Sequence, residues 1–343
     1  MEIERNYPDP ACVYAFVQRS FVSCSGGSKI SMTRFRYFSY IAAATLFTPL
    51  LIHAATDKTF QRTLHVSGTP AVVVHTGSGD IHVSQGAVNQ VAILGKIHSS
   101  NWGWGSPDEK TIDQIVQNPP IQQTGNIIQI GGQNDGSSSR GSIFGGHSIS
   151  IDYEITVPKG TDLKVHTGSG NLRMEAVSGP LQAGTGSGDI TASDMVTDSK
   201  LETGSGSIHA NNASGTLKLN TGSGDIELKD SSISDLNAQT GSGSMQLDGV
   251  QGHLRAGTGS GDITVKGTPS ADWYLETGSG NIDLTIPSSS KITLDAKGGS
   301  GSIHSDLPLT MQGELNKHHV EGTLNGGGSM IRAASGSGDI RIH

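Results

Sequence analysis

The residues best placed to do chemistry are carboxylates and hydroxyls that recur behind a pair of glycines. The unit first appears as Thr76-Gly77-Ser78-Gly79-Asp80-Ile81, and from residue 167 onward its first threonine recurs at steps of 18 or 19 residues. One polar residue follows the second glycine of each copy, and stacked carboxylates at that position could hold calcium ions. This polar column comprises Asp80, Asn171, Asp189, Ser207, Asp225, Ser244, Asp262, Asn281, Ser302 and Asp339.

The order of residue types in the polar column favours a structural role. From Asn171 onward, no two successive members are both aspartate. Carboxylates stacked at about 5 Å would repel each other by roughly 1 kcal/mol in water, and alternation with serine or asparagine avoids this repulsion. A calcium ladder would favour adjacent carboxylates instead. We therefore predict that the column lines a corner where the glycines adopt positive φ and the polar side chains bond to backbone amides, with no metal or other cofactor.

Two further pairs of residues could bind ligands. Trp102 and Trp104 flank a glycine, and exposed tryptophans can stack on sugar rings, although packing within a cap is the favoured interpretation. His318-His319 could ligate a metal. Neighbouring residues of a strand point to opposite faces, however, so a surface loop over residues 305–324 is predicted instead.

Recognisable catalytic motifs are missing from the sequence. The glycine-rich segments are not followed by the Gly-Lys-Ser/Thr of a phosphate loop, and their serines lack the strand-to-helix context of a nucleophile elbow. The 13 histidines show no metal-ligand spacing. Enzymatic β-helices carry long side loops with basic and acidic clusters, whereas the turns here are short and poor in Arg and Lys. We predict no catalytic or cofactor-binding residues and no enzymatic activity.

The elements that must position the polar column are short strands. Each repeat contains two apolar alternations, such as Leu181/Ala183 and Ile190/Ala192, which are typical of half-buried strands. Two strands and two turns per repeat make one coil, so we predict an all-β fold: a parallel β-solenoid of the single-stranded β-helix type with coils of about 18 residues. A β-sandwich of antiparallel hairpins is the alternative, but the near-constant step favours stacking.

The repeats divide the chain into segments. We predict the first coils over residues 56–97, an insertion over 98–147 and the main solenoid with a C-terminal cap over 148–343. The insertion should contain a short helix that starts at Ser106-Pro107-Asp108-Glu109 and ends at Pro119-Pro120, followed by a glycine-rich loop over 131–142. The helix is expected to cover an end or flank, since open ends expose unpaired strand edges. Residues 148–158 alternate cleanly and predict a strand.

Residues 1–55 are read as an over-long start followed by a secretory signal over about 32–55. Arg34 and Arg36 precede an apolar stretch and the small residues Ala54-Ala55; an uncleaved anchor is the alternative. Removing five Lys/Arg and three Asp/Glu takes the net charge from −8 to −10, which disfavours nucleic acid as a partner. Both cysteines precede Met32, so the mature chain would have no disulfide. It would also have no membrane span once the signal is removed. We expect the mature chain in the periplasm, at the outer surface or secreted.

Three features together resemble the bacterial putative-adhesin family of β-strand repeat proteins, catalogued as a domain of unknown function. They are the repeated glycine units, the stretch Ile151–Pro158 leading into Leu163–Thr167, and the closing Gly336–Ile340. The resemblance covers about residues 58–343, implies an exported envelope β-solenoid and transfers no catalytic residues.

The function predicted on this basis is that of a non-enzymatic envelope adhesin or binding scaffold for an unknown envelope polymer or surface protein. A structural or envelope-stress protein without an adhesive ligand is one alternative, and a carbohydrate-active β-helix enzyme is another. Any binding surface is expected on outward strand positions or on the 98–147 insertion.

Overall fold

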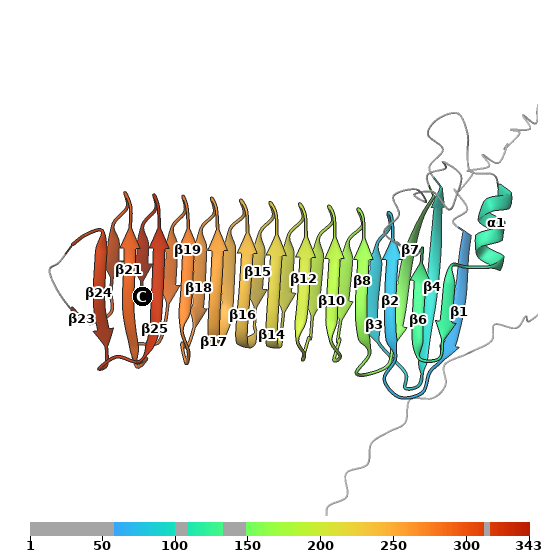
Figure 1. Cartoon of the computed structure of the whole chain (residues 1–343), viewed down its shortest axis with the longest axis horizontal. Coiled ribbons are helices and arrows are strands. Elements are labelled where there is room, and N and C mark those ends of the chain that lie inside the picture. Colours follow the sequence, from blue (N-terminus) through green and yellow to red (C-terminus); the bar gives the residue numbers. More distant parts are fainter. Residues whose placement is uncertain (1–57, 100–108, 133–148, 312–315) are drawn as a thin grey trace, which may run out of the picture. The chain divides into compact units, whose positions relative to one another are not determined.

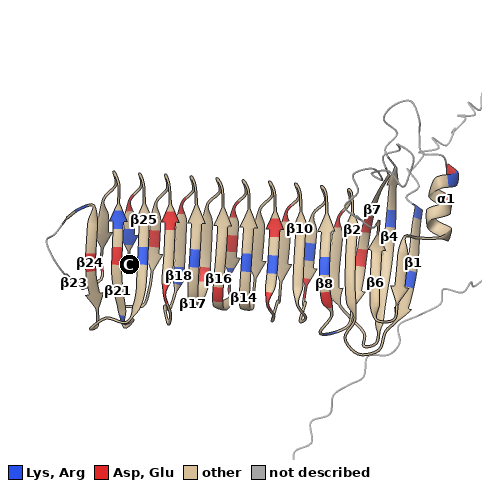
Figure 2. Cartoon of the chain, in the orientation of Figure 1, with Lys and Arg blue, Asp and Glu red and all other residues tan. Residues whose placement is uncertain are grey.

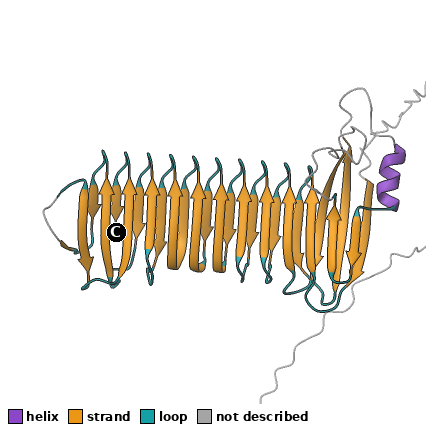
Figure 3. Ribbon diagram, in the orientation of Figure 1, coloured by secondary structure: helices purple, strands orange, loops and turns teal. Residues whose placement is uncertain are grey.

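The computed structural model describes residues 58–99, 109–132, 149–311 and 316–343, all within one compact unit of residues 54–343. These residues form 26 strands and one helix, so the fold is all-β and solenoid-like (Figures 1 and 3). The predicted signal segment, the Trp102 and Trp104 pair, the first three residues of the predicted helix cap and residues 133–142 of the predicted loop lie outside the described residues.

Hydrogen bonding arranges the strands in two rows. In spatial order, the first strand row runs through β5 (Ile121–Thr124), β6 (Ile127–Gly131), β2 (Ala71–Thr76), β8 (Asp162–Thr167), β10 (Leu181–Thr185), β12 (Ser199–Thr203), β14 (Ser214–Thr221), β16 (Ser232–Thr240), the second half of β17 (Met245–Thr258), β19 (Trp273–Thr277), β25 (Ser329–Ser335), β21 (Ile292–Gly298), β24 (His319–Leu324) and β23 (Thr310–Met311).

The second strand row lies behind the first and is joined to it at each coil. Its order is β1 (Lys58–His65), β4 (Gln90–Ser99), β7 (Ile149–Val157), β3 (Ile81–Gln85), β9 (Leu172–Glu175), β11 (Ile190–Ser193), β13 (Ile208–Asn211), β15 (Ile226–Lys229), the first half of β17, β18 (Ile263–Gly267), β20 (Ile282–Thr285), β26 (Ile340–Ile342) and β22 (Ile303–Ser305).

The central strands of both rows pair in parallel, and like residues stack on like. Leu181 lies opposite Leu163 in the first row, and Ala192 lies opposite Ala210 in the second. Alternate side chains point inward, so Ile, Leu, Val and Ala form buried ladders between the rows. Burial of these apolar side chains is the main source of stability. Thr185 is buried as well. Its hydroxyl donates a hydrogen bond to the Gly170 carbonyl oxygen (2.9 Å) and accepts one from the Gly188 amide (3.1 Å).

The motif glycines do not serve as positive-φ residues, contrary to the sequence-based prediction. Among the described Thr-Gly-Ser-Gly copies, only Gly79 has a positive φ, at 132°. The glycines are required instead because successive coils stack backbone on backbone. A Cβ on Gly222 or Gly224 would lie well under 3.0 Å from the carbonyl oxygen of Gly204 or Gly206, respectively, in the coil before.

The left-handed backbone lies at the opposite corner of the coil. Residues with positive φ recur there at steps of 18 or 19, namely Ala176, Asp194, Asn212, Asp230 and Gly249. Asparagine, aspartate and glycine tolerate this conformation better than other residues. One corner of the coil therefore requires glycine because backbones approach closely there. The other corner requires residues that tolerate a positive φ.

The ends of the stack are antiparallel, so the prediction of a wholly parallel array is wrong there. At one end β1 pairs with β4 and β4 with β7, and at the other β24 pairs with both β21 and β23, all antiparallel. The predicted helix is confirmed as α1 (Glu109–Gln117), and the predicted strand over 148–158 as β7. Helix α1 lies beside β1 with Ile115 buried, and Lys58 Nζ contacts Asp113 Oδ1 at 2.7 Å (Figure 1).

The C-terminal strands enter the stack out of sequence order. Strand β25 pairs with β19 on one side and β21 on the other, and β26 lies between β20 and β22. The predicted surface loop over residues 305–324 is also wrong in part, because β23 and β24 lie within it. Extending the sheet by short hairpins satisfies backbone groups that a loop would leave unpaired.

Candidate functional site

The polar column is a continuous hydrogen-bonded ladder along one corner of the stack. In each coil a side-chain oxygen of the column accepts a hydrogen bond from the backbone amide of the column residue in the next coil. Asp189 Oδ1, for example, accepts from the Ser207 amide at 2.8 Å, and Asp225 Oδ1 accepts from the Ser244 amide at 2.8 Å. The acceptors in spatial order are Asp152, Asp80, Asn171, Asp189, Ser207, Asp225, Ser244, Asp262, Asn281 and Asp339, and the last amide is that of Ser302.

The spatial order of this ladder differs from its sequence order at both ends. Asp152 lies in β7 and does not belong to a copy of the repeat motif. Its Oδ1 nevertheless accepts a hydrogen bond from the Asp80 amide at 2.9 Å. At the other end Asp339 precedes Ser302. The backbone hydrogen bond from Ser302 is the main cause that lowers the pKa of Asp339 below its ordinary value. The column therefore offers its oxygens to backbone amides, which favours the corner role over ion binding.

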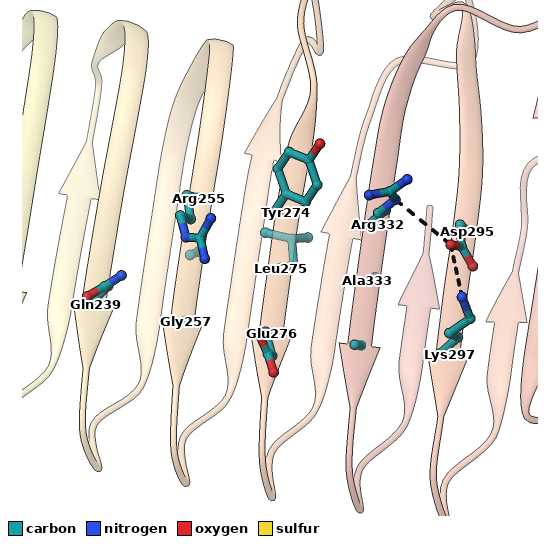
Figure 4. Close-up of a pocket in the computed structure, with 12 residues that line it drawn as sticks. Gln239, Arg255, Gly257, Tyr274, Leu275, Glu276, Asp295, Lys297, Arg332 and Ala333 are labelled. Atoms are coloured by element: carbon teal, nitrogen blue, oxygen red, sulfur yellow. Dashed lines mark hydrogen bonds and ion pairs between the residues drawn. The ribbon is translucent and has the colours of Figure 1, made fainter.

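A second group of residues forms a cleft on the outer side of the first strand row, which we call the outer cleft. It has a volume of about 350 Å³ and crosses β16, β17, β19, β25 and β21 (Figure 4). Gly257 and Ala334 have little or no side chain, so a hollow remains between the longer side chains around them. The other outward-facing side chains that line it are Gln239, Arg255, Tyr274, Glu276, Asp295, Lys297 and Arg332.

Three large side chains stand side by side along one edge of the outer cleft. Arg255 lies opposite Tyr274, and Tyr274 lies opposite Arg332, in consecutive parallel pairings (Figure 4). The Tyr274 side chain is 39% exposed, and the Arg332 guanidinium lies 5.6 Å from its ring centroid. An exposed aromatic ring between two guanidinium groups is suited to contact a sugar ring and to bond its oxygens.

Asp295 forms the charged end wall of the outer cleft. Its Oδ2 contacts Lys297 Nζ at 3.1 Å and Arg332 Nε at 4.0 Å, and its Oδ1 contacts His319 Nε2 at 3.1 Å. Partial burial acts to raise the pKa of this carboxyl, but the hydrogen bonds from Lys297 and His319 outweigh burial and hold the pKa below its ordinary value. Asp295 is therefore ionised at neutral pH.

The lowered pKa of Asp295 predicts a loss of stability in acid. A carboxyl group with a depressed folded-state pKa stabilises the fold above its unfolded pKa, and this contribution is lost as the pH falls through the folded value. Relative to Asp295→Asn, the wild-type chain should be more stable at pH 7 by about 0.5–1 kcal/mol, and the difference should shrink as the pH falls below the ordinary carboxyl pKa and through the lower folded-state value. Urea unfolding at several pH values measures this. The control is Asp235→Asn, an exposed residue of β16 with no ion pair among the described residues; an equal pH effect there would contradict the assignment.

Asp295, His319 and Glu321 also come close enough for their ligand atoms to lie within 4.8 Å of one another. His319 Nε2 bridges the two carboxylates, with Glu321 Oε1 at 3.0 Å. Lys297 and Arg332 already neutralise the Asp295 carboxylate, and two nearby positive charges oppose a bound cation. The cluster is therefore better suited to be an ion-pair network than a metal site. His318 points elsewhere, with Nδ1 2.9 Å from the Gly301 carbonyl oxygen.

Outward strand positions were expected from the sequence to hold any binding surface, but the outer cleft was not. A readable signal exists: Arg255, Tyr274 and Arg332 each stand three residues before the buried Thr or Ser of a repeat. Trp102 and Trp104, the ligand-stacking candidates, lie outside the described residues. Within the part of the chain that the structure describes, no helix has the length and apolarity needed to cross a membrane.

Comparison with known proteins identifies one matching family. The model of the Toastrack DUF4097 family matches residues 106–343. A "putative adhesin" from Bacteroides fragilis is similar in structure, at 14% identity and a TM-score of 0.37 over 83% of this chain and 97% of that chain. A "putative adhesin" from Parabacteroides distasonis has 11% identity and a TM-score of 0.38 over 84% of this chain and 98% of that chain.

A third similar structure is a "putative lipid binding protein" from Parabacteroides distasonis, at 14% identity and a TM-score of 0.36 over 84% of this chain and 98% of that chain. No curated protein matches the sequence. At these identities and TM-scores, the functions named for the solved structures do not transfer to this chain.

Proposed function

This chain belongs to the Toastrack DUF4097 family, and from that premise we propose that it is a non-enzymatic binding scaffold of the cell envelope, of the adhesin type. The outer cleft is the binding site, and its ligand is an extended envelope polymer. Export is part of the proposal and is supported by Arg34 and Arg36 ahead of the apolar stretch that ends near Ala55. Recovery of the protein from the envelope fraction tests it.

The observation that carries this proposal is the exposed Tyr274 ring between Arg255 and Arg332 above a hollow of about 350 Å³. Aromatic rings are usually buried in a β-structure of this kind, as Trp273 on the inner side of the same strand is. An aromatic side chain and two guanidinium groups left at the surface match the contacts that a polymer of sugars requires.

The charge state of Asp295 does not suit it to be the general acid of a hydrolase. Glycoside hydrolysis needs one carboxyl with a raised pKa as a general acid, together with a second carboxylate. The pKa of Asp295 is lowered instead, because Lys297 and His319 bond to its charged form. Asp295 is therefore suited to hold Lys297 and Arg332 in place, not to donate a proton.

We also infer that the centre of the stack is a parallel single-stranded β-helix with coils of about 18 residues. The support is the register: Ala183 pairs with Val165 on one side and Leu201 on the other, each 18 residues away. In such a coil every outward position is repeated along the stack. A ligand lying across the strands would meet one side chain per coil, at intervals of about 4.8 Å.

Binding with a purified panel of neutral and acidic envelope polysaccharides tests the proposed function. The wild-type chain should retain at least one polymer without shortening it, and Tyr274→Ala should weaken retention about tenfold, because the stacking surface is lost. His209→Ala, on the outer side of the second strand row, is the control and should bind as wild type. Release of shortened products would favour an enzyme, and no retention of any polymer, or of protein from an envelope extract, would favour a purely structural role.

A further inference from the structure

The row of outward side chains that contains Tyr274 extends far beyond the outer cleft. Each of these positions lies opposite the next in consecutive parallel pairings along the first strand row. From β8 to β25 the eight positions are Lys164, Gln182, Lys200, Lys218, Asn237, Arg255, Tyr274 and Arg332. Five of the eight are cationic and none is acidic, and we call this set the basic row. It ends at β21, where the next position is the acidic Asp295. Figure 2 shows the Lys and Arg of the basic row as bands at similar heights along the strands.

Three of the five cations of the basic row form no ion pair among the described residues. Lys164, Lys218 and Arg255 are exposed, and none of them forms an ion pair within the described ranges. Lys200 Nζ contacts Glu202 at 2.6 Å, and Arg332 reaches Asp295 at 4.0 Å. The row therefore offers hydrogen-bond donors and positive charge to a ligand at several successive coils.

The basic row breaks the charge pattern that the rest of the stack follows. In the polar column from Asn171 onward, carboxylates alternate with neutral residues, whereas Lys200 and Lys218 stand directly opposite each other. Two like charges at one strand spacing repel and destabilise the stack. The matching outward side chains of the second strand row include both positive and negative charges. They are Arg173, Thr191, His209, Glu227, Gln246, Thr264, Asp283 and Arg341. Glu202 partly offsets the charge of Lys200. The excess of positive charge that remains at Lys164, Lys218 and Arg255 is confined to one face and points to a bound anion.

Acidic side chains on both sides limit how wide that anion can be. They stand two residues away along the strands, at about 6–7 Å. On one side are Glu202 and Glu276, and on the other are Asp162, Asp198 and Asp235. A nucleic-acid duplex or an anionic membrane would bring its phosphates over these carboxylates and be repelled. A single polymer chain with one negative charge per monomer is narrow enough to lie between these carboxylates.

We propose that the basic row binds a single chain of a linear, carboxylate-bearing polysaccharide, which lies along the stack and crosses the strands. This inference rests on the proposed function and names its ligand class. Sugar carboxylates pair with Lys164, Lys218 and Arg255, because a charged donor and a carboxylate form strong hydrogen bonds. Gln182 and Asn237 bond to hydroxyls between them, and one sugar ring lies against Tyr274 in the outer cleft.

The test measures affinity of the purified full chain for five probes: oligogalacturonate, a linear sulfated glycan, a neutral linear glucan, oligothymidylate and phosphatidylglycerol vesicles. Oligogalacturonate should bind most tightly, and added salt should weaken its binding. The double variant Lys218→Gln/Arg255→Gln should bind it about tenfold or more weakly, since two charge-assisted contacts are lost. The control, Arg173→Gln/Lys266→Gln on the second strand row, makes the same change in net charge and should stay within about twofold of wild type.

Several outcomes would overturn the inference. An equal loss in the control variant would show that overall charge, not the row, attracts the polymer. Tighter binding of the sulfated glycan, oligothymidylate or vesicles would reject the carboxylated ligand. If the neutral glucan binds in a Tyr274-dependent way and oligogalacturonate does not, the inference fails and the proposed function stands. If no probe binds and envelope extract yields no partner, both fail. Unchanged thermal unfolding of both double variants confirms that folding is not the cause.

Discussion

Replacing Gly222 by alanine is expected to destabilise the protein by about 3 kcal/mol, whereas Gly77→Ala should be nearly neutral. Both glycines hold the same position in the repeat. A Cβ on Gly222 would overlap the carbonyl oxygen of Gly204 in the coil before, whereas a Cβ on Gly77 would meet nothing within 4 Å. The overlap involves backbone on both sides, so rotation of a side chain cannot relieve it.

Chemical unfolding followed by circular dichroism compares the two variants with wild type. The Gly77 variant should unfold at the wild-type midpoint or slightly above it, since alanine restricts the unfolded chain. Because stacked coils depend on their neighbours, the Gly222 variant should also broaden the transition. Two variants of equal stability would show that close stacking of the coils is not the reason for these glycines.

Trp273→Ala should cost about 3–5 kcal/mol, the largest effect expected of a single core substitution here. Trp273 is fully buried, and its Nε1 donates a hydrogen bond to the Gly252 carbonyl oxygen at 2.7 Å. It lies opposite Ile331 in β25, so the cavity would open where the C-terminal strand docks. We expect the variant to lose β25 and β26, together with strands β21–β24 that are held through them, before the rest of the stack unfolds.

Limited proteolysis read by mass spectrometry tests the Trp273 prediction together with thermal unfolding. The variant should be cleaved within residues 316–343 under conditions in which the wild type is intact. The matched control is Tyr274→Ala, the next residue of the same strand, which points outward and should cost less than about 1 kcal/mol. Cleavage first at the other end of the stack would contradict the docking role of Trp273.

Much of the fold could be predicted because local physics repeats in it. The inward alternation of residues such as Leu217 and Leu219 predicts half-buried strands, and both are buried in β14. The helix over Glu109–Gln117 was predictable from its apolar stripe and the prolines that follow. The reason for the motif glycines was not, because positive φ and close backbone approach both select glycine and leave the same sequence pattern.

The candidate site was predictable only in outline. Outward positions three residues before each repeat threonine can be read from the sequence, and they contain Lys200, Lys218 and Arg255. Nothing in the sequence showed that the small side chains at Gly257 and Ala334 would lie on either side of Glu276 and leave a hollow. That hollow depends on which strands are neighbours, and neighbour order is a property of the folded chain.

By itself, the sequence determined the repeated strand-and-corner unit, because each unit carries its own apolar alternation and its own glycines. Only the tertiary structure decided the order of the coils at the ends. By sequence order Asp295 would follow Tyr274, but β25 inserts between β19 and β21 and places Arg332 there instead. Parallel strands of similar composition can stack in any order at similar local energy. The choice depends on the total burial and edge pairing that the whole stack achieves.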